Sequence, residues 1–332
     1  MAQVDISVII LTYNSDYGKT ISTINSILNQ KKCSLEIIVA DDGSKENNFS
    51  CLDSYFSSCD FHNYQLIGDG INRGTVSNLY KAVQKSNGDC IKPISPGDYL
   101  FDETTLFNMM TVLKSNESAA CFGKAIYYMV QHNAFLFTPY SHNPYFIKPY
   151  IQQNIKKIRA NYLVFRDSIL GASLMYDKKA LVNELSIINN HVRYCEDSVL
   201  NLMVAKSNSI VFLNKNVIFY ESNTGISSKK KSKWTKFIYN DNHFVFDYLT
   251  QNNLLTISEF KKSFSNNRLI RFFLTVRFCF FKFLCRKIDR RHKIVKKMPI
   301  VLVNQIEYIS AFSNTKNDFL KNRGKMIEIQ ID

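Results

Sequence analysis

The chain has 332 residues, of which 45% are hydrophobic and 21% are charged. A chain of this length and composition can bury a substantial apolar core without disulfide staples, so extensive disorder is excluded. The formal net charge of +14 favours an anionic partner. Nucleic acid, anionic lipid and phosphorylated substrates all fit that charge, and the charge alone does not distinguish among them.

The cysteines and the N-terminus indicate an intracellular setting. The eight cysteines are scattered, with no CxxC pair and no metal-ligand spacing to histidine, as is typical of reduced thiols in a cytosolic protein. Residues 1–30 lack a basic segment followed by an apolar stretch and a cleavage site, because Thr12, Asn14 and Asp16 interrupt the apolar run. We therefore expect the protein to stay on the cytoplasmic side.

The first forty residues predict a βαβ unit. Residues 6–11 form an almost continuous β-branched run, which is typical of a strand covered on both faces. Apolar side chains recur at helical spacing over 19–30, and a second apolar run covers 35–40. Because parallel strands end at the same edge of a sheet, the polar segments that follow Leu11 and Ala40 are expected to line one crevice.

Two more strand ends continue this pattern. Residues 64–67 and 90–94 predict strands, with a helical pattern over 76–85 between them. Polar or glycine-containing segments follow both strands, at 72–75 and 95–98. The expected crevice therefore receives a loop from each of four strands.

The second part of the chain predicts a mixture of helices and strands, and its composition changes near Ser227. The expected helices are 104–113, 177–185 and 198–205, and the expected strands are 119–130, 134–137 and 210–219. Beyond Ser227 the chain is basic, aromatic and predicted to be helical. No internal repeat of 20–50 residues is present.

Three polar segments together resemble a known family. They are Thr12-Tyr13-Asn14, Asp41-Asp42-Gly43-Ser44 and the segment 72–78, in this order at the ends of successive βα units. An Asp-Gly pair alone is also explained by an ordinary turn. In combination, however, the segments resemble the inverting glycosyltransferases of family 2, over about residues 4–228.

The resemblance implies an α/β protein with the GT-A fold. That fold combines a Rossmann-like nucleotide-binding half with a mixed sheet, and here a C-terminal helical extension, basic and aromatic, follows it. The expected organisation is a nucleotide-sugar-binding half at 1–103 and an acceptor-binding half of the same domain at 104–228. Residues 229–332 are expected to form the extension and to associate with a membrane.

The resemblance also implies how the chain binds a UDP-sugar donor. Thr12, Tyr13 and Asp41 are expected to hold the base and ribose, with Asp41 on the uracil. Arg73 is expected near the base or diphosphate, and a guanidinium suits phosphate oxygens, although a surface arginine is the simpler alternative. The full expected set is Thr12, Tyr13, Asn14, Asp41, Asp42, Gly43, Asn72, Arg73, Gly74, Asn78, Ser95, Gly171 and Ala172.

The metal motif departs from the family. Family members carry Asp-x-Asp after the fourth strand, which holds Mg²⁺ or Mn²⁺ against the diphosphate, whereas residues 95–98 supply only Asp98. Asp98 is therefore the expected metal ligand, together with the diphosphate and waters. Two alternatives stay open: basic residues in place of a metal, and a turn that Asp98 merely caps.

Glu196 and Asp197 precede a helical pattern, where acidic residues also serve as caps. Family 2 enzymes carry a Glu-Asp pair at this place that supplies the general base. By resemblance, the base is Asp197, with Glu196 as the second choice. A base on the acceptor side, with the diphosphate leaving from the opposite face of the sugar, inverts the configuration.

The basic extension predicts a membrane surface. Basic residues crowd together from Lys229 onward, and the phenylalanine-rich segment 269–284 is interrupted by Arg271, Arg277 and Lys282. These charges favour a helix that lies on an anionic membrane over one that spans it, and a helix docked on the catalytic domain is the alternative.

Taken together, the sequence predicts a peripheral membrane enzyme on the inner face of the cell membrane. It is expected to transfer a hexose or N-acetylhexosamine from a UDP-sugar to a hydroxyl of a lipid-diphosphate-linked saccharide, in surface polysaccharide synthesis such as that of O-antigen. A protein or soluble-sugar acceptor stays open, and so does the identity of the sugar. Rival hypotheses are a nucleic-acid-binding protein, which leaves the strand-end carboxylates unexplained, and a catalytically impaired GT-A scaffold.

Overall fold

The computed structural model describes residues 3–131, 134–138, 144–222, 234–256, 276 and 296–299. Its strands are β1 (Ile6–Thr12), β2 (Leu35–Asp41), β3 (Tyr64–Ile67), β4 (Cys90–Ile94), β5 (Tyr99–Leu100), β6 (Ala120–Gln131), β7 (Ala134–Thr138), β8 (Leu174–Asp177), β9 (Ile210–Glu221) and β10 (Lys296–Pro299). Its α-helices are α1 (Tyr17–Leu28), α2 (Phe49–Ser58), α3 (Thr75–Lys85), α4 (Thr105–Ser115), α5 (Lys148–Ile151), α6 (Ile155–Arg159), α7 (Lys178–Ile188), α8 (Val199–Ala205) and α9 (Trp234–Gln251). Shorter turns of other helix types are Ala160–Val164, Gly171–Ser173 and Glu196–Ser198.

One mixed sheet runs through the molecule, in the order β10-β7-β6-β8-β4-β1-β2-β3. Its N-terminal part is parallel, because β1 pairs in parallel with β2 and β4, and β2 pairs in parallel with β3. In this register Thr12 lies opposite Asp41, and Ile10 lies opposite Ile94. The polar segments that follow these strands therefore meet at one edge, as the sequence predicted.

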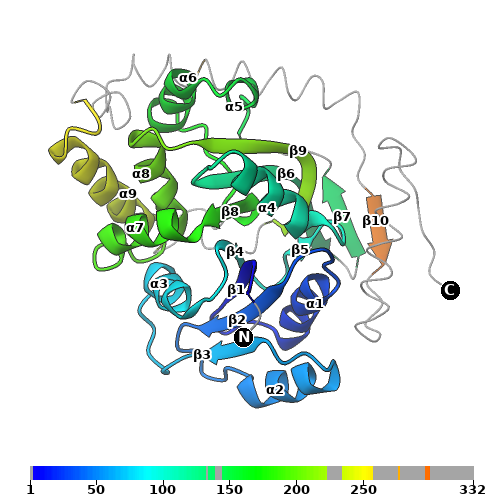
Figure 1. Cartoon of the computed structure of the whole chain (residues 1–332). Coiled ribbons are helices and arrows are strands. Elements are labelled where there is room, and N and C mark those ends of the chain that lie inside the picture. The colour runs from blue at the N-terminus through cyan, green and yellow to red at the C-terminus, as the bar shows by residue number, and fades with distance from the viewer. Residues whose placement is uncertain are drawn as a thin grey trace.

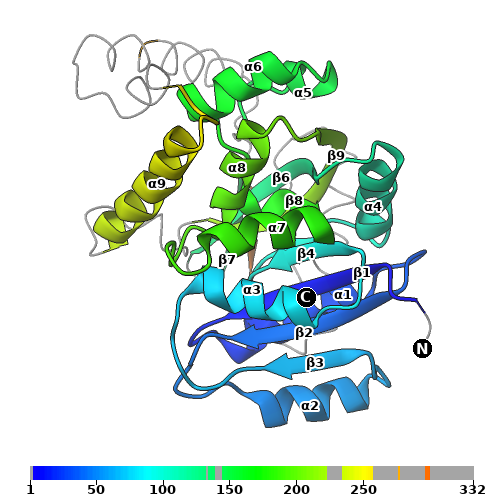
Figure 2. The same ribbon diagram turned by 60° about the vertical axis from the view of Figure 1, so that its left-hand side comes forward.

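The second part of the sheet mixes strand directions. β8 is antiparallel to β4 and β6, whereas β9 runs parallel to β6 and antiparallel to the short β5. Figures 1 and 2 show the parallel strands with α1, α2 and α3 at one end of the molecule, and α4 to α9 around the other. The expected α/β fold with a mixed sheet is confirmed.

Strand β1 separates two hydrophobic cores, because its side chains alternate between the faces of the sheet. Ile9 packs into the core that includes Val76 of α3, whereas Val8 and Ile10 pack into the core that includes Ile24 of α1. All five side chains are fully buried. Coverage on both faces explains why this strand is an almost continuous β-branched run.

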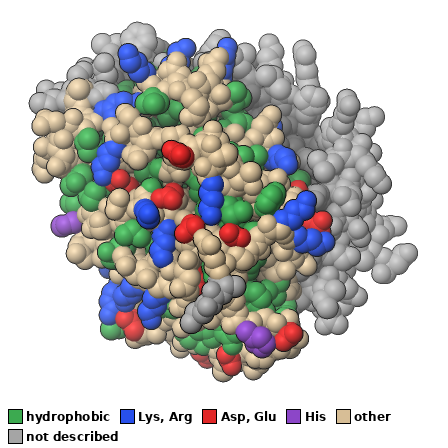
Figure 3. Space-filling model, in the orientation of Figure 1, with side chains coloured by type: hydrophobic (Ala, Val, Ile, Leu, Met, Phe, Trp, Pro, Cys, Tyr) green, Lys and Arg blue, Asp and Glu red, His purple; other side chains and the backbone are tan. Residues whose placement is uncertain are grey.

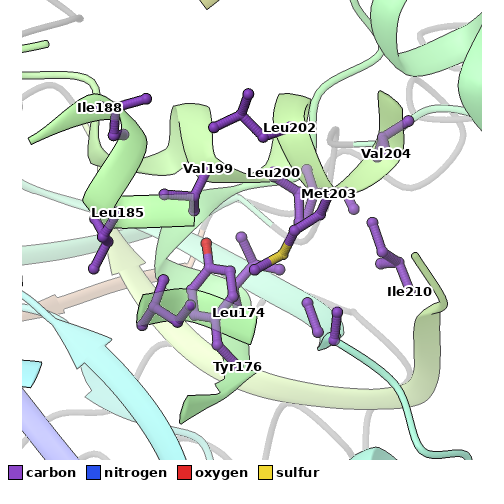
Figure 4. Close-up of a cluster of buried hydrophobic side chains, with 14 of the residues drawn as sticks. Leu174, Tyr176, Leu185, Ile188, Val199, Leu200, Leu202, Met203, Val204 and Ile210 are labelled. Carbon is purple, nitrogen blue, oxygen red and sulfur yellow. The ribbon is translucent and has the colours of Figure 1, made fainter. Parts of the chain in front are cut away.

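The core beside α3 extends into the second part of the chain. Figure 4 shows side chains of β8, α7, α8 and the start of β9 converging there. The labelled residues are Leu174, Tyr176, Leu185, Ile188, Val199, Leu200, Leu202, Met203, Val204 and Ile210. This packing fixes the start of α8, and with it the Glu196–Ser198 turn that precedes it.

Helix α9 belongs to this same core. Val245 and Leu249 are fully buried and Phe246 is 2% exposed. The sequence analysis assigned these residues to an extension beginning at 229, and in the structure the apolar side of α9 packs against the core formed by the preceding residues. The remaining extension, including Lys229 and most of the segment 269–284, lies outside the described residues.

The described surface carries both signs of charge. On the face seen in Figure 3, basic and acidic side chains are interspersed. Within the described ranges, no helix combines the length and the apolar character that crossing a bilayer requires.

The placement of α9 leads to a stability prediction. Leu249→Ala removes a fully buried side chain, and we expect it to lower the free energy of unfolding by about 2–5 kcal/mol through lost burial and an unfilled cavity. Tyr239→Ala on the same helix is the control, since Tyr239 is 58% exposed. Chemical denaturation of the full chain measures both, and equal effects would contradict the packing of α9 in the core.

Candidate functional site

A cleft of about 560 Å³ opens at the edge where the parallel strands end. Its walls come from distant parts of the sequence, including Leu11 of β1, Ser95 and Asp98 after β4, and Asp197 before α8. Phe246 of α9 also lines it. We call this the catalytic cleft.

Asp41 occupies the end of β2 and organises the neighbouring loops. It is 5% exposed, and its carboxylate accepts hydrogen bonds from Thr12 Oγ1 at 3.0 Å, from Ser44 N at 2.8 Å and from Ser44 Oγ at 2.5 Å. Ser44 Oγ in turn accepts the backbone N–H of Asn14 at 2.6 Å. The first two polar segments of the sequence pattern are thus joined at Asp41.

Asp42 joins the third polar segment to the second. Its carboxylate accepts the backbone N–H groups of Arg73 at 2.8 Å and of Gly74 at 3.0 Å. Burial raises the pKa of Asp42, and these two hydrogen bonds oppose the rise. Asn78 is also buried, and its side-chain amide donates to the carbonyl of Ala40 at 2.7 Å. Both side chains fix the position of the loop after β3.

Two glycines permit the close packing of these loops. Gly43 has φ +74°, and a Cβ there would lie 2.6 Å from the backbone nitrogen of Asn72. Gly74 has φ +97°, and a Cβ there would lie 2.4 Å from the carbonyl oxygen of Arg193. Both positions require glycine, because the backbone is left-handed and a neighbouring backbone occupies the space of a side chain.

A second cleft, of about 490 Å³, lies beside these loops, and Asp41, Asp42 and Arg73 line it. The Arg73 guanidinium donates to both oxygens of Asp69, at 2.7 and 2.5 Å, and Lys81 donates to Asp69 at 2.9 Å. These hydrogen bonds, from Lys81 first and then Arg73, hold the pKa of Asp69 well below its usual range. We call this the nucleotide cleft.

The loop after β4 is anchored on several sides. Gly97 N donates to Thr23 Oγ1 at 3.0 Å, and the Tyr128 hydroxyl donates to the carbonyl of Gly97. Asp98 is 4% exposed, and its carboxylate accepts the backbone N–H of Glu221 at 3.0 Å. Burial raises the pKa of Asp98 to about 7, so its protonated form is populated near neutrality.

The surroundings of Asp98 do not fit the expected Mg²⁺ or Mn²⁺ ligand. A carboxyl that binds a divalent ion must be deprotonated, whereas this carboxyl is buried, accepts a backbone N–H and has a raised pKa. Its loop neighbours Ser95, Pro96 and Gly97 add no carboxylate. Within the described part of the chain, no group of three or more His, Cys, Asp or Glu residues is arranged to hold a metal ion.

A lysine that the sequence analysis did not single out lies behind this loop. Lys92 of β4 is fully buried, and its ammonium donates to the carbonyls of Pro93 at 2.9 Å and Ala172 at 2.7 Å. Burial lowers the pKa of Lys92 to about 7, although the charge of Asp98 opposes that shift. Lys92 thereby ties the end of β4 to the Gly171–Ser173 turn.

A second pair that the sequence did not predict crosses the same edge. Lys19 of α1 forms an ion pair with Glu221 at the end of β9, at 2.5 Å. Glu221 is 5% exposed, and one of its carboxylate oxygens lies 2.3 Å from the position that a Cβ of Gly97 would occupy. Their separation in sequence, 202 residues, leaves no local signal for the pairing.

Glu196 and Asp197 lie together in the catalytic cleft. Asp197 is exposed and Glu196 is half-buried. A Cβ added to Gly171 would lie 3.9 Å from Oδ2 of Asp197, so the turn that precedes β8 runs directly beside that carboxylate. Although Asp197 opens to the cleft, the protein around the pair reduces its solvation, and this desolvation raises the pKa of both carboxyls. The charge of Asp197 raises the pKa of Glu196 further.

The segment before this pair is held by a carboxylate of α9. Asp241 is 5% exposed and accepts the backbone N–H groups of Arg193, Tyr194 and Cys195 at 3.2, 2.8 and 3.2 Å. The sequence analysis missed Asp241, although a carboxylate four residues before buried Val245 was a signal that it faces the core.

Ten of the predicted residues line one of the two clefts, whereas Thr12, Tyr13, Asn14, Gly43, Asn72 and Gly74 line neither. Ser95, Asp98, Gly171, Ala172, Glu196 and Asp197 line the catalytic cleft, whereas Asp41, Asp42, Arg73 and Asn78 line the nucleotide cleft. Tyr13 is 51% exposed and Asn14 is also exposed. Their roles in binding and catalysis stay predictions, since no ligand contact is described.

Comparison with known proteins agrees with this architecture. Residues 7–168 match the family described as "Glycosyl transferase family 2". No curated protein matches the chain by sequence. The similar solved structures include the crystal structure of S. aureus TarS 1-349, with 18% sequence identity, a TM-score of 0.52 and coverage of 80% of this chain and 73% of that chain.

A crystal structure of the same TarS region in complex with UDP-GlcNAc is similar to the same extent, with 18% identity, a TM-score of 0.53 and coverage of 80% of this chain and 74% of that chain. At this identity the likeness shows the fold. The family match identifies residues 7–168 as a glycosyltransferase family 2 domain, and the mixed α/β sheet and these structural neighbours show that the chain has the GT-A fold.

Proposed function

We propose that this glycosyltransferase uses a UDP-sugar donor and transfers its hexose or N-acetylhexosamine with inversion of configuration. The main support is that the Gly171 turn lies directly beside Asp197, in a cleft at the ends of the parallel strands. Ligands of open α/β sheets bind at this edge. The structural likeness to TarS, which was crystallised with UDP-GlcNAc, supports the same donor class.

The nucleotide cleft binds part of the donor, and proton transfer takes place in the catalytic cleft. Asp41, with Thr12 hydrogen-bonded to its carboxylate, serves the base and ribose, and Arg73 serves the base or diphosphate at the nucleotide cleft. The sugar lies along Gly171 and Ala172. Asp197 takes the proton from the acceptor hydroxyl while that oxygen attacks the anomeric carbon, and the nucleoside diphosphate leaves from the opposite face. Glu196, whose pKa is raised more strongly by its neighbour's charge, retains its proton while Asp197 is ionised.

No step of this mechanism is assigned to a metal. Mg²⁺ or Mn²⁺ would supply charge neutralisation at the leaving diphosphate, but the residues at Asp98 do not fit it. Asp98 instead fixes the end of β9 through the backbone of Glu221.

For the acceptor we propose a lipid-diphosphate-linked saccharide of surface polysaccharide, such as O-antigen. The enzyme would then be cytoplasmic and peripheral on the inner face of the membrane, held by the basic, aromatic residues beyond 256. Basic side chains attract anionic lipid at the membrane surface. The nucleic-acid alternative relies on the same basic, aromatic residues and leaves the carboxylates at the strand ends unexplained.

Donor binding tests the central proposal. UDP-glucose, UDP-galactose and the two UDP-N-acetylhexosamines are titrated against the full chain by calorimetry, in EDTA and again with Mn²⁺. We expect saturable binding of at least one donor. If no donor binds under either condition, while RNA or DNA binds in a salt-sensitive manner, the glycosyltransferase proposal fails and the nucleic-acid alternative gains support.

Removing the proposed base tests the chemistry. We expect Asp197→Asn to lower kcat by about 10²–10⁴-fold, as loss of a general base does, with little change in donor affinity. Glu196→Gln is the matched variant on the adjacent residue and should lose less activity. Transfer assays with radiolabelled donor measure both, and a larger loss in Glu196→Gln would reverse the assignment of the base.

The raised pKa values lead to a pH prediction. A base accepts a proton only when it is ionised, so kcat/KM should rise as pH increases through the apparent pKa of the Glu196–Asp197 pair. Because desolvation in the cleft raises both pKa values, this rise should lie above the ordinary aspartate value of about 3.9. A pH profile on enzyme shown to be folded measures it. Full activity maintained down to pH 4.5 would contradict the prediction.

Two glycines provide a matched test of the nucleotide cleft. Gly43 and Gly70 both have φ +74°, but a Cβ meets the backbone of Asn72 at 2.6 Å only from Gly43, and meets nothing within 4 Å from Gly70. We expect Gly43→Ala to weaken UDP binding roughly tenfold or more, because the 70–74 loop must move. Gly70→Ala should stay within about threefold of the wild type. Equal effects would show that backbone strain alone is responsible.

A further inference from the structure

Helix α9 carries a carboxylate on its buried side. Asp241, Val245 and Leu249 are spaced four residues apart, so they lie on one face of the helix, and all three are buried. An apolar side chain at position 241 would suit that face better unless the carboxylate has specific partners, since desolvating a charge is costly. The partners of Asp241 therefore indicate what the charge does.

Those partners are three consecutive backbone N–H groups. Asp241 Oδ1 accepts from Arg193 at 3.2 Å, and Oδ2 accepts from Tyr194 at 2.8 Å and from Cys195 at 3.2 Å. Hydrogen bonds to a carboxylate are roughly twice as strong as those between neutral groups. The backbone of 193–195 is thus fixed by one side chain from α9, directly before Glu196.

The opposite side of this segment contacts the nucleotide-binding loop. The carbonyl of Arg193 accepts the backbone N–H of Val76 at 3.2 Å, and the Arg193 guanidinium donates to Oδ1 of Asn72 at 3.0 Å. Gly74 is packed against the same carbonyl. The segment therefore lies between the loop expected to bind the nucleotide and α9, and the two catalytic carboxylates follow it.

We propose that Asp241 is a positioning residue for sugar transfer, which holds the 193–195 backbone so that Asp197 faces the acceptor side of the catalytic cleft. This inference rests on the proposed function and extends it to a helix that the sequence placed outside the catalytic domain. Asp241 does not line the catalytic cleft, whereas its neighbour Asn242 and Phe246 do. It acts through the backbone before Asp197, and small misplacements of a catalytic group reduce rate strongly.

Asp241→Asn is the most direct test. The amide keeps the shape of the side chain, but its NH₂ group faces a backbone N–H that the carboxylate oxygen accepted, so at least one hydrogen bond is lost. Asp247→Asn is the matched control on the same helix, since Asp247 is 40% exposed and pairs only locally with His243. Asp241→Glu tests whether a restored carboxylate rescues activity.

Two measurements on the full chain decide the outcome. In Asp241→Asn we expect kcat to fall by about tenfold or more while the donor dissociation constant changes less than about threefold. Hydrogen exchange of the amides at 193–195 should accelerate by about tenfold in that variant and stay unchanged in Asp247→Asn. Asp241→Glu should recover part of kcat.

The outcomes separate this inference from the proposed function. A folded Asp241→Asn protein with unchanged kcat, or with unchanged amide exchange at 193–195, overturns the positioning role. A loss confined to stability or donor affinity overturns it as well, because it indicates a purely structural residue. If the wild type transfers no sugar, the proposed function fails, and with it the role of Asp241 in transfer. Accelerated amide exchange at 193–195 in Asp241→Asn would then show only that Asp241 holds this segment.

Discussion

The parallel pairing of β1 with β2 and β4 is the constraint on which the site depends. Parallel strands in register end together, so Thr12 lies opposite Asp41 and the loop after β4 begins beside them. The other elements of the site lie against this edge, namely the Gly171 turn, the Glu196–Asp197 turn and α9. The apolar residues of β1 hold the edge in position because they are buried on both faces of the sheet.

Carboxylates at this edge have two different tasks. Asp42, Asp98 and Asp241 are buried and accept backbone N–H groups, so they determine the shape of loops. Asp197 is exposed to the cleft, which suits the proton transfer that we propose for it. Residue type and strand-end position alone did not separate these tasks, because burial and backbone partners are set by tertiary structure.

The sequence predicted those features that depend on local pattern. The β-branched run of β1 and the helical spacing of α3 located the parallel part of the sheet, and the ordered polar segments located the crevice. Contacts between distant segments were not predictable in this way. Lys19 with Glu221 and Asp241 with 193–195 depend on how β9 and α9 pack. Lys92 is the exception, because a lysine within the apolar strand β4 was a local sign of a buried ammonium with specific partners. An ammonium is rarely buried unless it is paired.

Two buried ionisable groups, Asp98 and Lys92, lie close to the cleft in which we propose that the diphosphate leaves. Asp98 has its pKa raised to about 7 and Lys92 has its pKa lowered to about 7, each chiefly by burial. An anion that binds nearby favours the protonated carboxyl and the charged ammonium, because each change adds positive charge next to it. Lys92 donates one hydrogen bond to the carbonyl of Ala172, so this buried pair is joined to the turn beside Asp197.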